Sequence, residues 1–247
     1  MKTILITGAT AGFGEATARK FVGGGWKVIG TGRRAERLQR LQEELGNAFL
    51  PLEIDMRDRA AIESLAQLSP PWGDIDLFLN NAGLAPPTDA LPDTDWERIE
   101  SVIETNVTGL VALTRVLLPK LIERKGQIIN LSSVAATYPY KGGAVYAGTK
   151  AFVHQFSLDL RSDLAGTGVR VTSVEPGMAE TEFTIVRTGG DKAASDALYA
   201  GANPMTAQDL ADLFWWLATL PPHLNINIVE LMPVTQSFAG FTVTRKT

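Results

Sequence analysis

The fold is decided by the stretch Thr3-Ile4-Leu5-Ile6-Thr7-Gly8-Ala9-Thr10-Ala11-Gly12-Phe13-Gly14. Its first five residues are apolar or β-branched and predict a buried strand, and residues 15–21 have helical character. Without a Cβ atom, Gly8, Gly12 and Gly14 permit a tight turn and a close approach of the backbone to a pyrophosphate at the start of the helix. We therefore expect a phosphate-binding turn; the alternative is that the glycines only let a helix pack on a strand.

Seven short β-branched runs alternate with amphipathic stretches along the chain. The runs are residues 3–7, 26–31, 48–54, 75–80, 127–131, 169–174 and 227–231. Helical spacing of apolar residues is clearest over residues 99–121 and 153–164. This alternation predicts an α/β fold: a doubly wound, Rossmann-like unit with a seven-stranded parallel sheet and helices on both faces. Because no long linker interrupts the pattern, we expect a single domain over residues 1–247.

Composition argues against several classes of protein. The chain has 247 residues, of which 45% are hydrophobic and 20% charged, as is typical of globular domains. A net charge of -4 without a dense Lys/Arg run argues against a nucleic-acid partner. With no cysteine and 2 histidines, no metal site is expected. The apolar start is too short for a signal sequence, and we expect no later segment to be long enough to span a bilayer. We therefore expect a cytoplasmic protein without a membrane partner.

The second predicted strand ends in Thr31-Gly32-Arg33-Arg34. A dinucleotide fold that prefers NAD usually has an acidic residue there to bind the ribose 2′-hydroxyl. Arg33 and Arg34 can instead pair with a 2′-phosphate, which favours NADP(H). The alternative is a solvated helix start, although cations there oppose the helix dipole.

Tyr146 and Lys150 lie four residues apart at the start of a predicted helix, so they share one face. A neighbouring ammonium would favour the phenolate and lower the pKa of Tyr146 towards the neutral range. Ser133 precedes Tyr146 by thirteen residues and could polarise the same carbonyl oxygen. The three residues together predict general acid-base chemistry on a carbonyl or alcohol.

The chain resembles the short-chain dehydrogenase/reductases from end to end. The motifs that carry the resemblance are TGATAGFG, Asn80-Asn81-Ala82-Gly83, Asn106, Ser133, Tyr146, Lys150 and Pro176-Gly177. It implies that Tyr146 is the general acid in reduction and the base in oxidation, and that Ser133 orients the substrate oxygen. It also implies that Lys150 holds the nicotinamide ribose and that Asn106 anchors a proton-relay water.

The same resemblance implies a set of cofactor contacts. Asp55 would contact the adenine, Asn81 would lie beside the adenosine ribose, and Thr181 would bind the carboxamide. Asp55 could equally cap a strand end, Thr181 a helix, and Asn106 could be a polar residue inside a helix. The expected cofactor-binding residues are Thr7, Gly8, Thr10, Gly12, Phe13, Gly14, Arg33, Arg34, Asp55, Met56, Asn81, Ala82, Gly83, Tyr146, Lys150, Pro176, Gly177 and Thr181.

The resemblance narrows to bacterial NADP-dependent 3-hydroxy acid dehydrogenases, through residues 31–34, 138–140 and 232–237. It implies a small anionic substrate such as L-allo-threonine, serine, 3-hydroxypropionate or malonic semialdehyde. We hypothesise that Arg187 binds the acid group and that Gln236 contacts the substrate with Ser133 and Tyr146. Arg187 could instead form a surface salt bridge, and Gln236 a subunit contact.

Two other functions remain open from the sequence. A sulfoacetaldehyde reductase would bind another compact anion and use the same Tyr146 chemistry. A noncatalytic redox sensor would bind the dinucleotide without turnover, but the chain keeps Ser133, Tyr146, Lys150 and Asn106. In the resembling family, the helices that contain Asn106 and Tyr146 form a subunit interface, so a homodimer or homotetramer is expected.

Overall fold

The computed structural model describes residues 1–238 and is built around one parallel sheet. The sheet has seven strands in the order β3-β2-β1-β4-β5-β6-β7. The strands are β1 (Thr3–Thr7), β2 (Lys27–Gly32), β3 (Phe49–Glu53), β4 (Leu77–Asn80), β5 (Gln127–Leu131), β6 (Arg170–Pro176) and β7 (Ile228–Leu231). The predicted seven-stranded doubly wound fold is confirmed. The prediction of one domain extends to residues 239–247, which lie outside the described residues.

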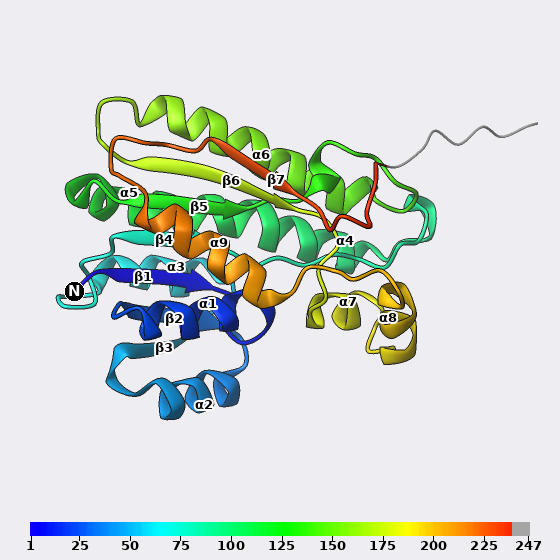
Figure 1. Cartoon of the computed structure of the whole chain (residues 1–247), viewed down its shortest axis with the longest axis horizontal. Helices are drawn as coiled ribbons and strands as arrows, with labels where there is room; N and C mark the ends of the chain where they lie inside the picture. Colours follow the sequence, from blue (N-terminus) through cyan, green and yellow to red (C-terminus); the bar gives the residue numbers. More distant parts are fainter. Residues whose placement is uncertain (239–247) are drawn as a thin grey trace, which may run out of the picture.

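Helices cover both faces of the sheet (Figure 1). They are α1 (Gly12–Gly23), α2 (Ala35–Leu45), α3 (Arg59–Ser64), α4 (Trp96–Ile103), α5 (Leu110–Arg124), α6 (Ala144–Asp163), α7 (Glu182–Arg187), α8 (Lys192–Tyr199) and α9 (Ala207–Thr219). Side chains alternate along each strand, so β1 sends Ile4 and Ile6 into one core and Leu5 into the other. The first core lies under α1, α2 and α9, and the second under α3, α5 and α6.

The helical run Trp96–Arg124 comprises α4, a π-helical segment over Glu104–Gly109, and α5. By length and composition it could cross a membrane, so the expectation that no segment is long enough was wrong. However, 44% of its most apolar window is buried, and Leu113, Leu117 and Leu121 pack into the second core. These contacts explain why the run is apolar, because a helix that packs into a protein core can have the same length and composition as one that crosses a membrane.

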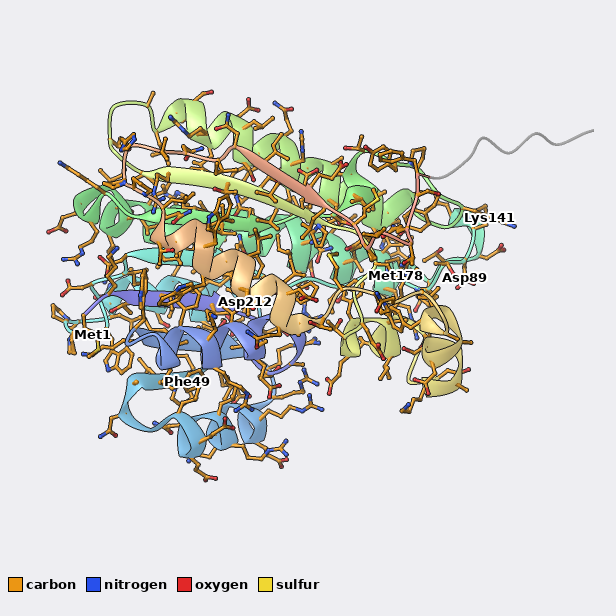
Figure 2. All side chains as sticks on the ribbon, viewed as in Figure 1. Met1, Phe49, Asp89, Lys141, Met178 and Asp212 are labelled. Atoms are coloured by element: carbon orange, nitrogen blue, oxygen red, sulfur yellow. The ribbon has the colours of Figure 1, made fainter. Side chains whose placement is uncertain are left out.

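The strand order reverses between β1 and β4, which are paired in the sheet although two strands separate them in the chain. At such a switch point the loops after the two strands diverge and leave a crevice at the carboxyl ends of the strands. In Figure 1, α7 and α8 lie beyond this end of the sheet, and in Figure 2 Met178 lies towards the same end, opposite Met1. The fold therefore collects the loops after β1, β4, β5 and β6 around one crevice.

The sequence patterns did not predict α7 and α8. Gly189 and Gly190 form the turn between them, with φ angles of +70° and +97° that favour glycine. Asp191 then caps α8, since its side chain accepts a hydrogen bond from the amide of Ala194. Helices of six and eight residues are too short for a clear periodic pattern, which is why periodicity missed them.

Candidate active site

A pocket of about 500 Å³ lies at the carboxyl ends of the strands. Most of the residues expected to bind cofactor or substrate line it: Gly8, Thr10, Gly12, Phe13, Arg33, Arg34, Asp55, Met56, Asn81, Ala82, Gly83, Ser133, Tyr146, Lys150, Pro176, Gly177 and Thr181. The predicted site residues that do not line the wall are Thr7, Gly14, Asn106, Arg187 and Gln236. Tertiary structure thus brings residues from six strand ends, those of β1 to β6, to one cavity.

The turn after β1 is held by residues that stand behind the pocket wall. The side-chain amide of Asn81 donates to the Thr7 carbonyl at 2.8 Å, and the backbone amides of Asn81 and Ala82 both donate to the Thr7 hydroxyl at 2.9 Å. A Cβ atom at Gly14 would overlap the carbonyl oxygen of Gly8. Thr7 and Gly14 therefore shape the turn and need no contact of their own with a ligand.

Two glycines of this turn have backbone conformations that L-residues rarely adopt. The φ angle is +70° at Gly8 and +54° at Gly12. A Cβ atom added to Gly12 would lie 3.3 Å from the Cβ of Thr181. The segment that starts α7 therefore closes against the glycine turn, and a side chain at Gly12 would push it away.

Arg34 is fixed at the rim of the pocket beside the glycine turn. Its Nε and Nη2 atoms donate to the Thr10 hydroxyl at 3.1 and 2.9 Å, and its Nη1 donates to Glu182 at 3.0 Å. Glu182 also accepts hydrogen bonds from Arg37 at 2.7 and 2.8 Å. The guanidinium of Arg34 thus faces the pocket and does not simply extend into solvent, as the alternative of a solvated helix start would require.

Asp55 lines the pocket beyond the end of β3 and is tied to Arg57. Its carboxylate accepts from Arg57 Nη2 at 2.7 Å and from the Arg57 backbone amide at 3.0 Å. These hydrogen bonds, with a smaller effect from the charge of Arg33, hold the pKa of Asp55 below its usual value. Asp55 is therefore an anionic acceptor next to Arg33.

Ser133 and Tyr146 meet on the pocket wall, where α6 begins beside the loop after β5. Burial raises the pKa of Tyr146 to about 12, although a hydrogen bond with Ser133 and, to a smaller extent, the charge of Arg187 act in the opposite direction. The expectation that Lys150 lowers this pKa is wrong for the protein alone. The Lys150 ammonium is 5.7 Å from the centre of the Tyr146 ring, and desolvation of the phenol is the largest effect on the Tyr146 pKa.

Lys150 is almost fully buried, with 4% of its surface exposed. Its ammonium donates a hydrogen bond of 2.7 Å to the carbonyl of Leu131, the last residue of β5. Burial lowers the pKa of Lys150 to about 8, because the charged form loses its hydration. The ammonium is therefore held at the pocket wall by β5, and it loses its proton at a lower pH than an exposed lysine would.

Asn106 lies inside the π-helical segment between α4 and α5 and is 2% exposed. Its side chain accepts from the amide of Leu84 at 2.8 Å, donates to the carbonyl of Leu84 at 2.8 Å, and donates to the Thr149 hydroxyl at 3.0 Å. The side chain thus joins the loop after β4 to α6. This is the alternative role of a polar residue within a helix, and the anchoring of a relay water stays a prediction.

Arg187 ends α7 and lies over the ring of Tyr146. Its guanidinium carbon is 5.5 Å from the ring centre of Tyr140 and 5.7 Å from that of Tyr146. Nη2 donates to the Tyr140 hydroxyl at 2.9 Å and Nε to the Pro86 carbonyl at 3.3 Å. The alternative of a surface salt bridge does not fit these neutral partners, and a cation is held beside the ring of Tyr146.

Thr181 and Gln236 hold the segment that follows β6. The Thr181 hydroxyl caps α7 by accepting from the amide of Phe183 at 3.2 Å, as its alternative role predicted, and Thr181 also lines the pocket. The side-chain oxygen of Gln236 accepts from the amide of Met178 at 2.6 Å. Gln236 therefore supports the pocket wall from behind, in contact with the loop and not with the cavity.

Three charged residues of this region were missed from the sequence: Arg37, Arg57 and Glu182. Arg37 lies one helical turn after Arg34, and that spacing could have identified it. Glu182 is 148 residues from Arg34 in the chain, so no local pattern could have linked them. Their meeting depends on the loop after β6 folding back over the loop after β1.

Comparisons with known proteins agree with this geometry. A family described as short chain dehydrogenase matches residues 2–190. Serine 3-dehydrogenase of Agrobacterium fabrum is 61% identical over 99% of this chain and 98% of that protein. NADP-dependent 3-hydroxy acid dehydrogenase YdfG of Salmonella typhi is 53% identical over 98% of this chain and 99% of that protein.

A solved structure described as the closed form of serine dehydrogenase complexed with NADP+ superposes with a TM-score of 0.96 at 51% identity. It covers 99% of this chain and 100% of the solved chain. The resemblance stated from the motifs is thereby confirmed, including its narrower part. The chain belongs to the short-chain dehydrogenase family.

Proposed function

We propose that the protein is an NADP(H)-dependent oxidoreductase that interconverts a small anionic aldehyde or ketone and its alcohol, with a 3-hydroxy acid and its semialdehyde as the substrate pair. The observation that carries the anionic part is the position of Arg187, 5.7 Å from the ring of Tyr146. A guanidinium at that distance from the proton donor can hold a carboxylate while the adjacent carbon reacts. The names of the relatives, serine 3-dehydrogenase and NADP-dependent 3-hydroxy acid dehydrogenase, support the same substrate class.

The residues of the pocket fit NADP(H). The glycine turn fits a pyrophosphate, because Gly8 and Gly12 line the pocket and the turn is packed so closely that a Cβ atom at Gly14 would overlap the Gly8 carbonyl oxygen. Arg33 and Arg34 line the rim where a 2′-phosphate would bind, and the naming of relatives as NADP-dependent supports that assignment. When bound, the nicotinamide supplies or accepts the hydride. Its ribose would be held by Lys150 and its carboxamide by Thr181.

Tyr146 is the proton donor in this proposal. With a pKa of about 12, the phenol is protonated at neutral pH and can give its proton to a carbonyl oxygen as that oxygen gains charge. Ser133, which lines the same pocket as Tyr146, orients the same oxygen. In alcohol oxidation Tyr146 accepts the proton, and its high pKa makes this direction favour alkaline solution.

The decisive experiment compares kcat/KM for NADPH oxidation with malonic semialdehyde, sulfoacetaldehyde and a neutral aldehyde of the same length. We expect malonic semialdehyde to exceed the neutral aldehyde by about 10-fold or more, as one charge-assisted hydrogen bond would give. A higher value for sulfoacetaldehyde would identify the sulfonate as the substrate anion. If neither anionic aldehyde exceeds the neutral one, the proposed substrate class is wrong; cofactor binding without turnover on any of them would favour a sensor.

We also propose that the protein works as a homodimer or homotetramer, in the cytoplasm. Three large apolar side chains are exposed on neighbouring helices: Trp96 and Ile103 on α4 and Phe152 on α6. A second copy of the chain would remove them from water. Sedimentation of the purified protein tests this, with a charged substitution such as Phe152→Glu expected to give monomers.

A further inference from the structure

We propose that Glu182 tunes the choice between NADP(H) and NAD(H), because its carboxylate occupies hydrogen-bond positions on Arg34 and Arg37 that a 2′-phosphate would otherwise use. The inference rests on the proposed function, in which the 2′-phosphate binds at Arg34. It means that the first residue of α7, the helix that ends at Arg187, affects binding at the 2′-phosphate end of the cofactor. No local sequence pattern places an acid there.

The geometry puts a carboxylate directly in the arginine cluster. Both oxygens of Glu182 accept from Arg37 Nη1, at 2.8 and 2.7 Å, and one also accepts from Arg34 Nη1 at 3.0 Å. Glu182 lines the same pocket as Arg34. A fold of this kind that prefers NAD has an acid at the end of the second strand, and here an acid reaches the same region from α7.

The charge of Glu182 is secured by its partners. Hydrogen bonds from Arg37 lower the pKa of Glu182, and those from Arg34 add to the effect, so the carboxylate is ionised at neutral pH. A 2′-phosphate bound at Arg34 must share this guanidinium with the Glu182 carboxylate, and the two negative charges repel each other. A ribose 2′-hydroxyl carries no such charge. The repulsion therefore weakens NADP(H) binding and leaves NAD(H) binding largely unaffected.

Glu182 has a second effect, which the two cofactors share. It lies next to Thr181, which packs against Gly12, and on the same six-residue helix as Arg187. The ion pair with Arg34 and Arg37 thus helps to close α7 over the pocket. Because this contribution is the same for both cofactors, it cancels in the ratio of their dissociation constants, and the ratio reports the electrostatic effect alone.

The test measures dissociation constants for NADPH and NADH by fluorescence titration of the full-length protein. We compare wild type with Glu182→Gln and with Glu180→Gln, which removes the same charge two residues away. Glu180 is exposed and forms no ion pair within residues 1–238. Thermal unfolding of each variant checks that it is folded.

We expect Glu182→Gln to raise the ratio Kd(NADH)/Kd(NADPH) by about 3- to 10-fold, the size of one partly screened charge interaction. The increase should shrink in high salt, which screens exposed charges. Glu180→Gln should leave the ratio within about 2-fold of wild type. An unchanged or lower ratio in Glu182→Gln, or an equal rise in both variants, would overturn the inference.

Arg34→Ala separates this failure from failure of the proposed function. That variant should lose most of the preference for NADPH, because it removes a guanidinium from the 2′-phosphate. If Arg34→Ala keeps the wild-type ratio, the 2′-phosphate does not bind at Arg34, and both the proposed cofactor site and this inference are wrong. If Arg34→Ala lowers the ratio while Glu182→Gln leaves it unchanged, only the inference fails.

Discussion

The guanidinium carbon of Arg187 lies 5.7 Å from the centre of the Tyr146 ring, so the end of α7 is positioned over the start of α6. Hydrogen bonds to the Tyr140 hydroxyl and to the Pro86 carbonyl hold the guanidinium there. A fixed cation beside a proton donor can orient an anionic carbonyl compound. The arrangement also lowers the pKa of Tyr146 slightly, against the larger effect of burial.

Arg187→Ala should raise KM for an anionic aldehyde by roughly 30- to 150-fold, because it removes a charge-assisted hydrogen bond worth about 2 to 3 kcal/mol. The KM of a neutral aldehyde should change little. Tyr140→Phe is the matched control: it keeps the cation and removes one of its hydrogen bonds, so a smaller increase is expected. Steady-state kinetics with both substrates checks this, and an unchanged KM for the anion excludes a binding role for Arg187.

Tyr146→Phe should lower kcat by about 1000-fold, within the usual range for loss of a general acid, while the Kd of NADPH stays near the wild-type value. For wild type, the reduction rate should show no loss of the acid between pH 6 and 9, because the phenol has a pKa of about 12. Alcohol oxidation should accelerate with rising pH in the same range. The assignment would be contradicted if the reduction rate of wild type fell with rising pH while the Lys150 ammonium is still charged, below pH 8.

Lys150→Met should abolish turnover yet stabilise the fold. The pKa of Lys150 is about 8 in the folded protein against 10.5 ordinarily, so protonation favours the unfolded chain. This penalty is complete below pH 8 and disappears as the pH rises from 8 to 10.5. The pKa difference corresponds to roughly 3 kcal/mol, and loss of the hydrogen bond to Leu131 offsets part of it, which leaves a gain of about 1 to 2 kcal/mol at pH 7.

Urea unfolding of wild type and Lys150→Met at pH 7 and pH 10 measures this difference. The stability advantage of the variant should narrow towards pH 10, since only wild type loses a buried proton in that interval. Lys125→Met, at an exposed position just before β5, is the control and should show no such change. If Lys150→Met is less stable than wild type at both pH values, burial does not disfavour the ammonium.

Gln236→Ala should affect the loop after β6 more than it affects substrate binding. The variant loses the 2.6 Å hydrogen bond from the Met178 amide, at a cost of about 1 kcal/mol of stability. We expect kcat to fall a few-fold and KM for anionic and neutral aldehydes to change by the same factor. A selective rise of KM for the anion would restore Gln236 as a substrate ligand.

Periodicity predicted the sheet well because the buried strands are short, continuous apolar runs. The predicted bounds of β1 and β5 match the observed ones, and β2, β3, β4, β6 and β7 differ by one or two residues at their ends. The glycine turn and the i, i+4 spacing of Tyr146 and Lys150 are likewise local, so the chain specifies them without distant partners. The helices α7 and α8 were missed because short helices depend on the surface they cover.

The sequence by itself determined the fold class, the glycine turn, the paired arginines after β2 and the Ser133, Tyr146 and Lys150 set. Each of these depends on residue type and on the spacing of residues along the chain, without knowledge of distant contacts. Only tertiary structure decided that burial raises the pKa of Tyr146 and that Arg187 faces its ring. It also decided that a carboxylate 148 residues away, Glu182, binds Arg34. Desolvation and long-range charge pairs depend on how distant segments meet in space, which no local pattern contains.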